Sequence, residues 1–296
     1  MNFSYIRNIA NTKQHYYGWG HIIKQFINST KLLNDGVVLD TWVDQKNDKQ
    51  QLDLISNNLW IGILHATPSN INNYSLRNFI NSDNFKLSKK NCQCLITTSE
   101  HSKKHLKSLT DLPVKVLLHP KPNTGHCFDL DYYLANPSIR HSGFYARNII
   151  NFIKFDTNIR KVIYSDRENR NNVYNKTLNS NSHSIIYKSQ YLENSDYIHL
   201  LTTSIGFSFF DDCSASNSIL EHIMTHTPLI INRIPPIEEY LGRDYPLFID
   251  CLDGKNDKLL LDINFIKDVS QYLEQVSKRE EFSIDYFNNY LHTLSL

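Results

Sequence analysis

The sequence predicts an α/β protein that is divided into two domains. Short apolar runs alternate with stretches of helical periodicity, which is typical of parallel strands connected by helices. The chain has 296 residues, more than one typical core needs and fewer than three domains would use. This alternation stops at the polar, Pro-containing segment 121–138 and then starts again. We therefore expect one domain over residues 1–136, a second over 137–280, and a C-terminal helix in 281–296 that packs back on the first.

The first half contains four apolar runs of strand length and two stretches of helical periodicity. Ser99 comes just before the second of these stretches and is a good N-cap, because its hydroxyl can accept a hydrogen bond from a free backbone N–H of the first turn. The predicted strands are 36–43 (GVVLDTWV), 59–65 (LWIGILH), 94–99 (CLITTS) and 114–120 (VKVLLHP), and the predicted helices are 20–28 and 100–109.

The second half repeats the alternation of strands and helices. Glu238 and Glu239 follow a Pro-Pro turn and are expected to begin a short helix, where carboxylates suit the helix dipole. Segment 166–184 has few apolar residues and is predicted to be an exposed loop. The predicted strands are 139–146, 161–166, 204–211 and 228–233, and the predicted helices are 218–226, 264–276 and 283–294.

The composition excludes several function classes. Hydrophobic residues make up 41% and charged residues 21% of the chain, with a formal net charge of +1, so no basic footprint for nucleic acid is present. The basic run 101–109 is interpreted as the solvated face of a helix. No apolar run approaches the roughly 20 residues of a membrane span, and no secretory signal is visible at the N-terminus. Cys92 and Cys94 lie in an apolar run and indicate strand packing, so we expect a cytoplasmic protein without structural zinc or disulfides.

A cluster of small polar residues follows the apolar strand SIGFSFFD and precedes a helix. Ser214, Ser216 and Asn217 would therefore lie at the carboxyl end of a parallel strand, where open α/β sheets bind ligands. Free backbone N–H groups and the positive end of the helix dipole attract a phosphate at such a position. The short side chains add donors without bulk, so a diphosphate can approach closely.

Glu221 lies about one turn into the helix that follows this cluster. Its carboxylate could accept hydrogen bonds from the two hydroxyls of a ribose. The alternative is a capping box, in which Ser218 and Glu221 only satisfy the backbone of their own helix, and the spacing by itself favours this alternative.

The rest of the segment resembles a known family. Glu221-His-Ile-Met-Thr-His-Thr227-Pro228-Leu-Ile-Ile-Asn232-Arg233 is similar to the C-terminal half of nucleotide-sugar glycosyltransferases of the GT-B fold. The continuation NRIPPIEEYLGRDYPLF resembles glycosyltransferase-like proteins of microbes and large DNA viruses still more closely. The resemblance is specific across about 205–248 and weaker at 59–70, 95–106 and 142–148.

The resemblance implies two Rossmann-like domains facing a cleft, with the nucleotide held mainly by the C-terminal domain. Glu221 matches the ribose-binding glutamate of the family. Many retaining members carry another glutamate eight residues earlier, where this chain has Cys213. Asp211 and Asp212 are nearby but out of register, so a simple mechanism with a Glu-x7-Glu pair is in doubt.

Arg147 falls after the first strand of the second half, where the family usually keeps a cation against the diphosphate. A guanidinium can neutralise the charge of the leaving group with two parallel hydrogen bonds. Lys154 is a candidate for the second cation of the family's pair, with a surface ion pair as the alternative.

Gly18 and Gly20 come just before a predicted helix and would let the backbone approach a donor phosphate or sugar, as the equivalent glycine loop does in the family. A turn at the start of a helix explains the two glycines equally well. Tyr17 and Trp19 could stack on an acceptor sugar or simply pack.

His65 would lie at the carboxyl end of a strand, hence at the cleft, like the active-site histidine of GT-B N-terminal domains. It could act as a base or form a hydrogen bond to the transferred sugar, and a purely structural histidine is the alternative. His15 and His21 are rival bases.

Together these features predict a glycosyltransferase that moves a hexosyl or pentosyl group from a UDP- or GDP-linked donor to a hydroxyl of a glycan or another glycoconjugate. The resemblance implies that no divalent metal is required. A non-catalytic GT-B-like module that binds a nucleotide or glycan is the second hypothesis, and an isomerase or phosphorylase on the same scaffold is a third.

Overall fold

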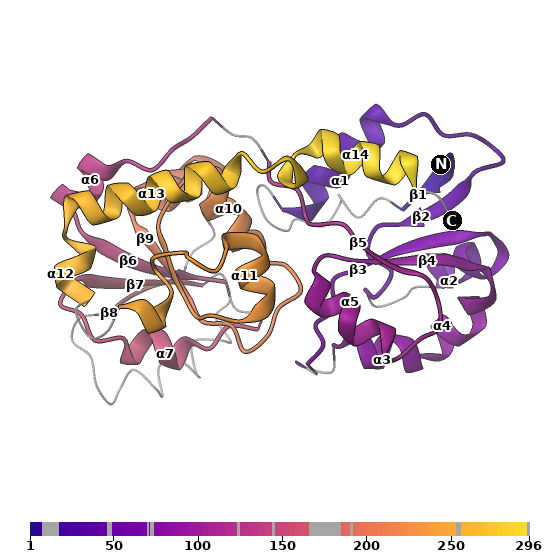
Figure 1. Ribbon diagram of the computed structural model, residues 1–296, viewed down its shortest axis with the longest axis horizontal. Helices are drawn as coiled ribbons and strands as arrows, with labels where there is room; N and C mark the ends of the chain where they lie inside the picture. Colours follow the sequence, from indigo (N-terminus) through magenta and orange to yellow (C-terminus); the bar gives the residue numbers. More distant parts are fainter. Residues whose placement is uncertain are drawn as a thin grey trace.

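The computed structural model describes residues 1–7, 18–45, 49–69, 71, 74–122, 125–143, 146–165, 185–189, 192–252 and 256–294. In these ranges the chain forms two five-stranded sheets, one at the centre of each of two lobes that lie side by side (Figure 1). All the strand pairs within the two sheets are parallel. Within the described ranges, no helix is both long enough and apolar enough to cross a bilayer.

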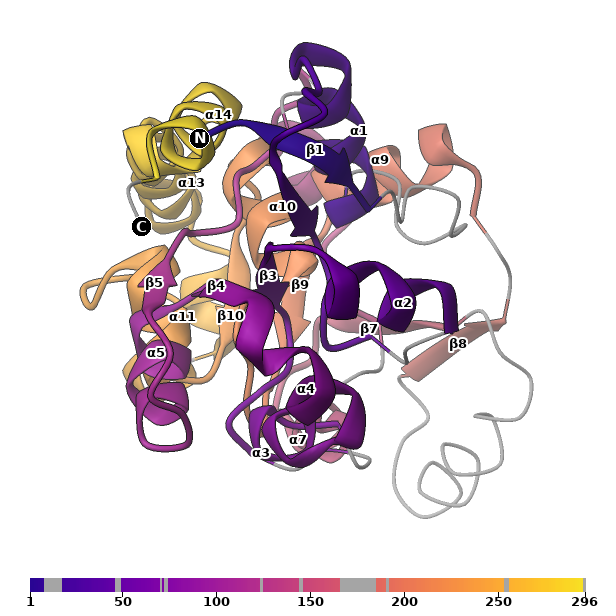
Figure 2. The same cartoon turned by 90° about the vertical axis from the view of Figure 1, so that its right-hand side faces the viewer.

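The N-terminal sheet has the strand order β1-β2-β3-β4-β5. Its middle strand, β3 (Trp60–Leu64), is buried along its whole length, because helices cover both faces of the sheet. Helices α1 and α14 cover one face and helices α2 to α5 cover the other (Figure 2). The other elements are β1 (Phe3–Ile6), α1 (Trp19–Ser29), β2 (Val37–Asp40), α2 (Lys49–Asn57), α3 (Leu76–Asn81), α4 (Asp83–Ser88), β4 (Cys92–Thr97), α5 (Glu100–Lys107), β5 (Val114–Val116) and α14 (Ile284–Thr293), with a 3-10 turn at Lys89–Asn91.

Alternating side chains of the N-terminal strands enter the two hydrophobic layers. Ile61 and Ile63 of β3 face the layer under α1 and α14, whereas Trp60 and Leu64 face the layer under α2 to α5. Ser99 caps α5 by accepting a hydrogen bond from the N–H of Ser102, as its position before the helix predicts.

The C-terminal sheet has the order β10-β9-β6-β7-β8, in which the first strand of the domain lies at the centre. This is a doubly wound arrangement. Its elements are α6 (Leu130–Ala135), β6 (Ser138–Ser142), α7 (Ile149–Lys154), β7 (Arg160–Ser165), β8 (Ile185–Ser189), α9 (Asn194–Thr203), β9 (Ile205–Ser208), α10 (Asn217–Thr225), β10 (Leu229–Ile231), α11 (Pro235–Leu241), α12 (Asn256–Leu260) and α13 (Ile263–Ser277), with 3-10 turns at Ile249–Cys251 and Glu280–Phe282.

The chain passes between the lobes twice. It passes first after β5 and again after α13, and the two connecting segments touch where the N–H of Lys121 donates to the carbonyl oxygen of Phe282 at 2.9 Å. Helix α13 runs along the C-terminal lobe and α14 continues over the N-terminal lobe (Figure 1), where Phe287 and Leu291 enter the hydrophobic layer of α1.

The structure differs from the predicted elements at several points. The sequence pattern did not predict strands β1 and β8 or helices α2, α3, α4, α7, α9 and α12. The predicted strand 139–146 ends at Ser142, because Gly143 turns the backbone with a φ of +80°. Helix α6 lies inside the segment predicted as a linker, 121–138, since Asp129 caps it by accepting from the N–H of Tyr132. The predicted loop 166–184 lies outside the described residues, and the domain boundaries at 136 and 280 stay predictions.

Candidate functional site

The C-terminal sheet has a switch point between its neighbouring strands β6 and β9. Strands β7 and β8 continue the sheet on one side and β10 continues it on the other, so the connections leave β6 and β9 in opposite directions. Diverging connections open a crevice at the carboxyl ends of the strands, where such sheets bind ligands. Residues after Ser142 and after Ser208 therefore line the candidate site.

Arg147 lies in this crevice. Its Nη2 donates to the hydroxyl of Ser218 at 3.0 Å and lies 3.4 Å from that of Ser216, and its guanidinium carbon lies 5.0 Å from the ring centre of Phe210. The guanidinium of Arg147 can occupy this place because residue 143 is a glycine: a Cβ at that position would lie 2.4 Å from Nη1 of Arg147. The structure thus brings three predicted positions together: Arg147, Ser216 and the start of the following helix.

Arg140 is a second cation that sequence reasoning missed. It projects from β6, is 2% exposed, and donates to the hydroxyl of Ser142 at 2.8 Å and to Nε2 of His222 at 3.3 Å. The only sequence signal is an arginine inside an apolar strand. Among the described residues, neither Nε of Arg140 nor Nε of Arg147 has a hydrogen-bond partner.

Burial lowers the pKa of Arg147, while the nearby Glu221 carboxylate and Tyr197 raise it. Arg140 also acts on Arg147 as a like charge. In the described part of the site, the positive charge of two guanidinium groups thus exceeds the negative charge of one carboxylate, that of Glu221. A buried cation with an unused donor is costly unless an anion pairs with it. The cluster is therefore suited to an anionic ligand.

The N-terminus of α10 points its first amides into the same crevice. Ser216 is the N-cap residue and Asn217 is the first residue of the helix, and no described side chain caps it. The N–H of Ile219 already donates to the carbonyl oxygen of Ser216, so the amides of Asn217 and Ser218 are the ones available to an anion. Ser214 has a different role, because its hydroxyl donates to the carbonyl oxygen of His65 at 2.7 Å in the other domain.

Glu221 is 3% exposed and accepts a hydrogen bond at Oε2 from the phenol of Tyr197 on α9. Burial raises the pKa of Glu221 to about 7, although the Tyr197 hydrogen bond and the charges of Arg140 and Arg147 act in the opposite direction. A carboxylate held here, about one turn behind the helix N-terminus, is placed to accept hydrogen bonds from a ligand in the crevice.

The capping-box alternative is wrong. The N-cap of α10 is Ser216 rather than Ser218, and Glu221 contacts Tyr197 instead of the start of its own helix. The hydroxyl of Ser218 accepts from Arg147. The sequence pattern alone could not separate these arrangements, because Tyr197 lies 24 positions away.

The position of the missing glutamate is buried. Cys213 is 4% exposed in the hydrophobic core, and burial raises the pKa of its thiol. The neighbouring Asp212 directs its carboxylate toward the N-terminal domain, where Oδ2 accepts from the N–H of Ser69 at 2.8 Å and Oδ1 lies 3.8 Å from Nε2 of His101. Asp212 therefore bridges the two domains.

His65 lies at the carboxyl end of β3, opposite Ser214. Its ring packs against Trp19 and Trp42, with centroid distances of 4.6 and 5.1 Å, and its Nε2 lies 3.2 Å from the carbonyl oxygen of Thr41. Burial, and secondarily the charge of His119, lowers the pKa of His65 to about 3. The ring is therefore neutral at physiological pH.

Asp44 is a further buried acid that sequence reasoning missed. Its carboxylate accepts from the N–H of His65 at 2.9 Å and from the N–H of Ala66, and the side chain of Tyr74 also bonds to it. Burial raises the pKa of Asp44 to about 7 against these hydrogen bonds. This network holds the end of β3 where His65 meets the other domain.

The glycine pair begins helix α1. Gly18 is its N-cap with a φ of −79°, which other residues also adopt, and Gly20 is the second helical residue. Trp19 is buried, and its Nε1 donates to the carbonyl oxygen of Thr41 at 2.8 Å. Trp19 thus packs beneath His65, and the described geometry of Gly18 is that of a helix start.

The remaining candidates lie elsewhere. His15 and Tyr17 fall outside the described residues. His21 lies on α1, with Nε2 2.9 Å from Nε2 of Gln25. Across the described ranges, no three His, Cys, Asp or Glu side chains gather as a metal site.

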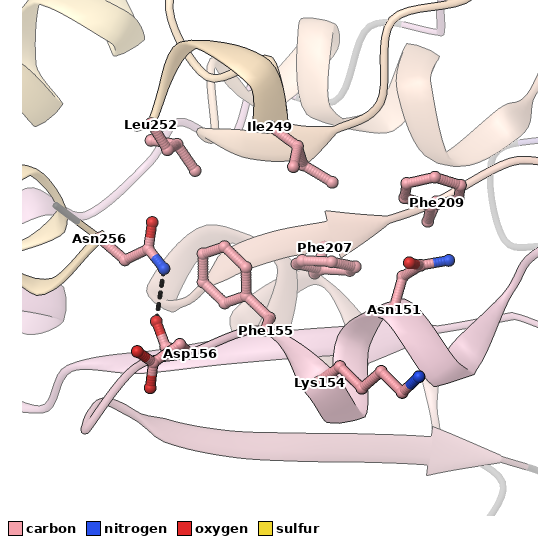
Figure 3. Close-up of a pocket in the computed structure, with 9 residues that line it drawn as sticks. All are labelled: Asn151, Lys154, Phe155, Asp156, Phe207, Phe209, Ile249, Leu252 and Asn256. Carbon is pink, nitrogen blue, oxygen red and sulfur yellow. Dashed lines mark hydrogen bonds between the residues drawn. The ribbon is translucent and has the colours of Figure 1, made fainter. Parts of the chain in front are cut away.

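Lys154 is exposed and lines a cavity of about 280 Å³ on one face of the C-terminal sheet (Figure 3). Figure 3 shows the rings of Phe155, Phe207 and Phe209 along this cavity, with Lys154 at its edge. Neither Arg147 nor the start of α10 lines it. The second cation of the site, next to Arg147, is therefore Arg140 and not Lys154. The full lining is Asn151, Lys154, Phe155, Asp156, Phe207, Phe209, Ile249, Leu252 and Asn256.

The protein has two lobes, each built on a parallel sheet, and the loops at the carboxyl ends of the strands in one lobe face those of the other. These features define the class of this protein. Two of the inter-domain contacts described above join loops at the carboxyl ends of strands, where Ser214 meets His65 and Asp212 meets Ser69. This is the arrangement of the GT-B fold, and the fold class predicted from the sequence is confirmed.

Several solved structures have a similar shape. The chain superposes on the pneumococcal O-GlcNAc transferase GtfA in complex with UDP and GlcNAc with a TM-score of 0.59 and 12% identity, covering 91% of this chain and 58% of that one. For sucrose-phosphate synthase from Thermosynechococcus elongatus the TM-score is 0.65 with 9% identity, covering 98% and 97%. For Anabaena HepE in complex with UDP and glucose the TM-score is 0.61 with 11% identity, covering 92% and 81%.

The chain spans 58% of the length of GtfA and 57% of the length of TarM, another similar structure. No protein-family model matches the sequence, and no curated protein matches it. At these identities the likeness establishes the fold, and function must be argued from the site.

Proposed function

We propose that this protein is a glycosyltransferase that moves a sugar from a nucleoside diphosphate sugar to a hydroxyl acceptor. The observation that carries the proposal is the buried pair Arg140 and Arg147 at the switch point of the C-terminal sheet. Each has an Nε without a partner among the described residues, and the uncapped amides of α10 lie beside Arg147. This arrangement suits a diphosphate, which needs several converging donors.

Arg147 would bind the diphosphate together with Ser216 and the amide of Asn217. Breaking the glycosidic C–O bond leaves negative charge on the nucleoside diphosphate. A guanidinium that is already oriented in a water-poor site stabilises that charge without reorganisation. The hydroxyl of Ser216 lies 3.4 Å from Nη2 of Arg147, so both groups can reach one phosphate.

Glu221 would accept the ribose hydroxyls. Its carboxylate is buried behind the same helix terminus, and a ribose is connected directly to the diphosphate that the terminus would hold. Two of the similar structures, those of GtfA and Anabaena HepE, are complexes with UDP, which supports a uridine nucleotide as the first donor to test, with a guanosine nucleotide as the alternative.

His65 would face the reacting sugar from the N-terminal domain. Its pKa of about 3 makes it a weak base near pH 7, because an efficient general base has a pKa close to the working pH. We therefore favour a hydrogen-bonding role for His65. The proposal includes a hexosyl or pentosyl donor, a glycan or other glycoconjugate acceptor, catalysis without a metal ion, and action in the cytoplasm.

The test is nucleotide binding by the wild type and by Arg147→Gln. Thermal-shift measurements with UDP, GDP, ADP and their sugar conjugates identify the preferred nucleotide, because a ligand of the native state raises its apparent stability. Titration calorimetry on Arg147→Gln should then give a loss of affinity of about hundredfold, since hydrogen bonds from a charged donor are worth about 1.5–3 kcal/mol each.

Lys154→Gln is the matched control, because Lys154 is also a cation near α7 but lies on the separate cavity. It should bind nucleotide as the wild type does. A folded Arg147→Gln variant with unchanged affinity would remove the basis of the proposal.

The second candidate is a binding module without turnover. The buried Cys213, which replaces a glutamate of the retaining pattern, is the observation in its favour. Transfer or hydrolysis of a labelled donor supports the enzyme, whereas tight binding without turnover across the donor panel supports the module.

A further inference from the structure

Tyr197 covers the carboxylate that we assign to the ribose. Its phenol donates to Oε2 of Glu221, and both side chains come from neighbouring helices, α9 and α10. An apolar contact between Ile198, Leu201 and Met224 holds these helices together, with Tyr197 packed against it. The contact is thus built into the junction of the two helices.

The phenol uses one of the two oxygens of Glu221. A ribose carries hydroxyls on adjacent carbons and can donate to both oxygens of one carboxylate. Because Glu221 is 3% exposed, little room is left at Oε2 for a second donor beside the phenol, so the second hydroxyl and the phenol compete for this position. Glu221 is 3% exposed in the presence of this contact, whereas Tyr197 is only partly buried.

We propose that the Tyr197 phenol stands in for a ribose hydroxyl: it satisfies Oε2 of Glu221 in the nucleotide-free protein and leaves when a ribose with both hydroxyls binds. This inference rests on the proposed function, because it assigns Glu221 to the ribose. It makes Tyr197 a specificity-determining residue. A nucleotide with both hydroxyls must break the tyrosine contact, whereas a 2′-deoxynucleotide binds with the contact retained.

The consequence is a reduced preference for ribose in the wild type. Removing the phenol by Tyr197→Phe leaves Oε2 of Glu221 without its donor in the free protein. Binding of a ribonucleotide then restores a lost hydrogen bond and becomes tighter. A 2′-deoxynucleotide cannot reach Oε2 and gains nothing. The ratio of the Kd for the 2′-deoxynucleotide to the Kd for the ribonucleotide should rise about tenfold.

The charged groups around Glu221 set the conditions of the experiment. Arg140 from β6 and Arg147 from the loop after it favour the ionised carboxylate, and burial opposes it. Removing the phenol removes a further group that favours ionisation, so the pKa of Glu221 should rise in Tyr197→Phe. Titrations are therefore done at both pH 8 and pH 9. An unionised Glu221 gains less from the ribose, so a raised pKa of Glu221 makes ribonucleotide binding to Tyr197→Phe weaker at pH 8 than at pH 9.

The experiment compares UDP with 2′-deoxy-UDP by calorimetry on the wild type, Tyr197→Phe and the control Tyr5→Phe, whose side chain is exposed on β1; GDP or ADP and its 2′-deoxy form replace this pair if thermal shift prefers them. A rise in the ratio for Tyr197→Phe alone supports the inference. A loss of ribonucleotide affinity shows that Tyr197 holds Glu221 in the bound state, and an unchanged ratio shows a structural contact. Either result overturns it.

A wild-type measurement covers the case in which Tyr197→Phe does not fold. In protein labelled with ¹³C at the tyrosine Cζ, UDP should move one tyrosine signal, that of Tyr197, which 2′-deoxy-UDP leaves in place, and identical effects of the two ligands overturn the inference. A wild type that binds none of the nucleotides refutes the proposed function itself, which is a different outcome from binding with an unchanged ratio.

Discussion

Replacing Glu221 with glutamine should make the protein more stable and weaken nucleotide binding at the same time. Burial raises the pKa of Glu221 from its ordinary value of 4.5 to about 7, even though Arg140 and Arg147 lie nearby. At pH 8 the protein therefore holds a buried negative charge that folding disfavours. Such a cost is expected at a binding site, where function and stability conflict.

The size of the effect follows from the two pKa values. A carboxyl whose pKa is raised by folding contributes stability that is fully present below about pH 4.5 and is lost as the pH rises through about 7. The difference between the two values corresponds to about 3 kcal/mol of unfolding free energy. A neutral glutamine can keep the hydrogen bond from Tyr197 without this loss, so Glu221→Gln should be up to about 3 kcal/mol more stable than the wild type at pH 8.

Urea unfolding of the two proteins at pH 5 and pH 8 measures this difference directly. The gain should be present at pH 8 and small at pH 5, where the wild-type carboxyl is protonated. Other groups that titrate in this range, such as Asp44, cancel in the comparison because both proteins contain them. Glu274→Gln, an exposed carboxyl on α13, is the control and should give no such gain. A Glu221→Gln variant that is less stable at pH 8, or equally shifted at both pH values, would refute the reasoning.

Two further substitutions test the geometry of the site and of the domain junction. Gly143→Ala should lower the unfolding free energy by about 1–2 kcal/mol because of its positive φ, and should weaken nucleotide binding at least tenfold because the new Cβ displaces Arg147. Gly125→Ala has a similar φ of +70° with no atom within 4 Å, so calorimetry should detect no change in its affinity. Glu239→Ala should lower the free energy of unfolding in urea by about 1 kcal/mol, because Glu239 accepts from the first two amides of α5 across the domain junction; an unchanged unfolding free energy would contradict that account.

The elements predicted correctly are those in which the local sequence pattern matches the burial of the side chains in the structure. The run at 59–65 became β3 because all five residues of the strand are buried, and the amphipathic stretch 264–276 became α13. Strand β8 and helix α9 were not predicted. Helix α9 has only Ile198, Leu201 and two threonines in the core, so its pattern is weak, and its place follows from packing against α10.

The residues of the candidate site also fall into those that the sequence pattern predicted and those that it missed. The polar cluster at 214–217, Arg147 and Glu221 could be recognised because a strand, a loop of small residues and a helix follow one another directly in the chain. Arg140 could not be recognised, since an arginine in a strand shows no function until the sheet places it beside Arg147. Asp44 was missed for the same reason.

By itself, the sequence determined the alternation of strands and helices, the two-domain division as a prediction, and the strand end at which an anion would bind. Only the tertiary structure decided which groups meet there. Tyr197 reaches Glu221 across 24 positions, and Ser69 reaches Asp212 across 143. Local patterns reflect burial and backbone preference over a few residues, whereas the charge balance and hydrogen bonding of a buried site depend on contacts that only the order of strands and the meeting of two domains create.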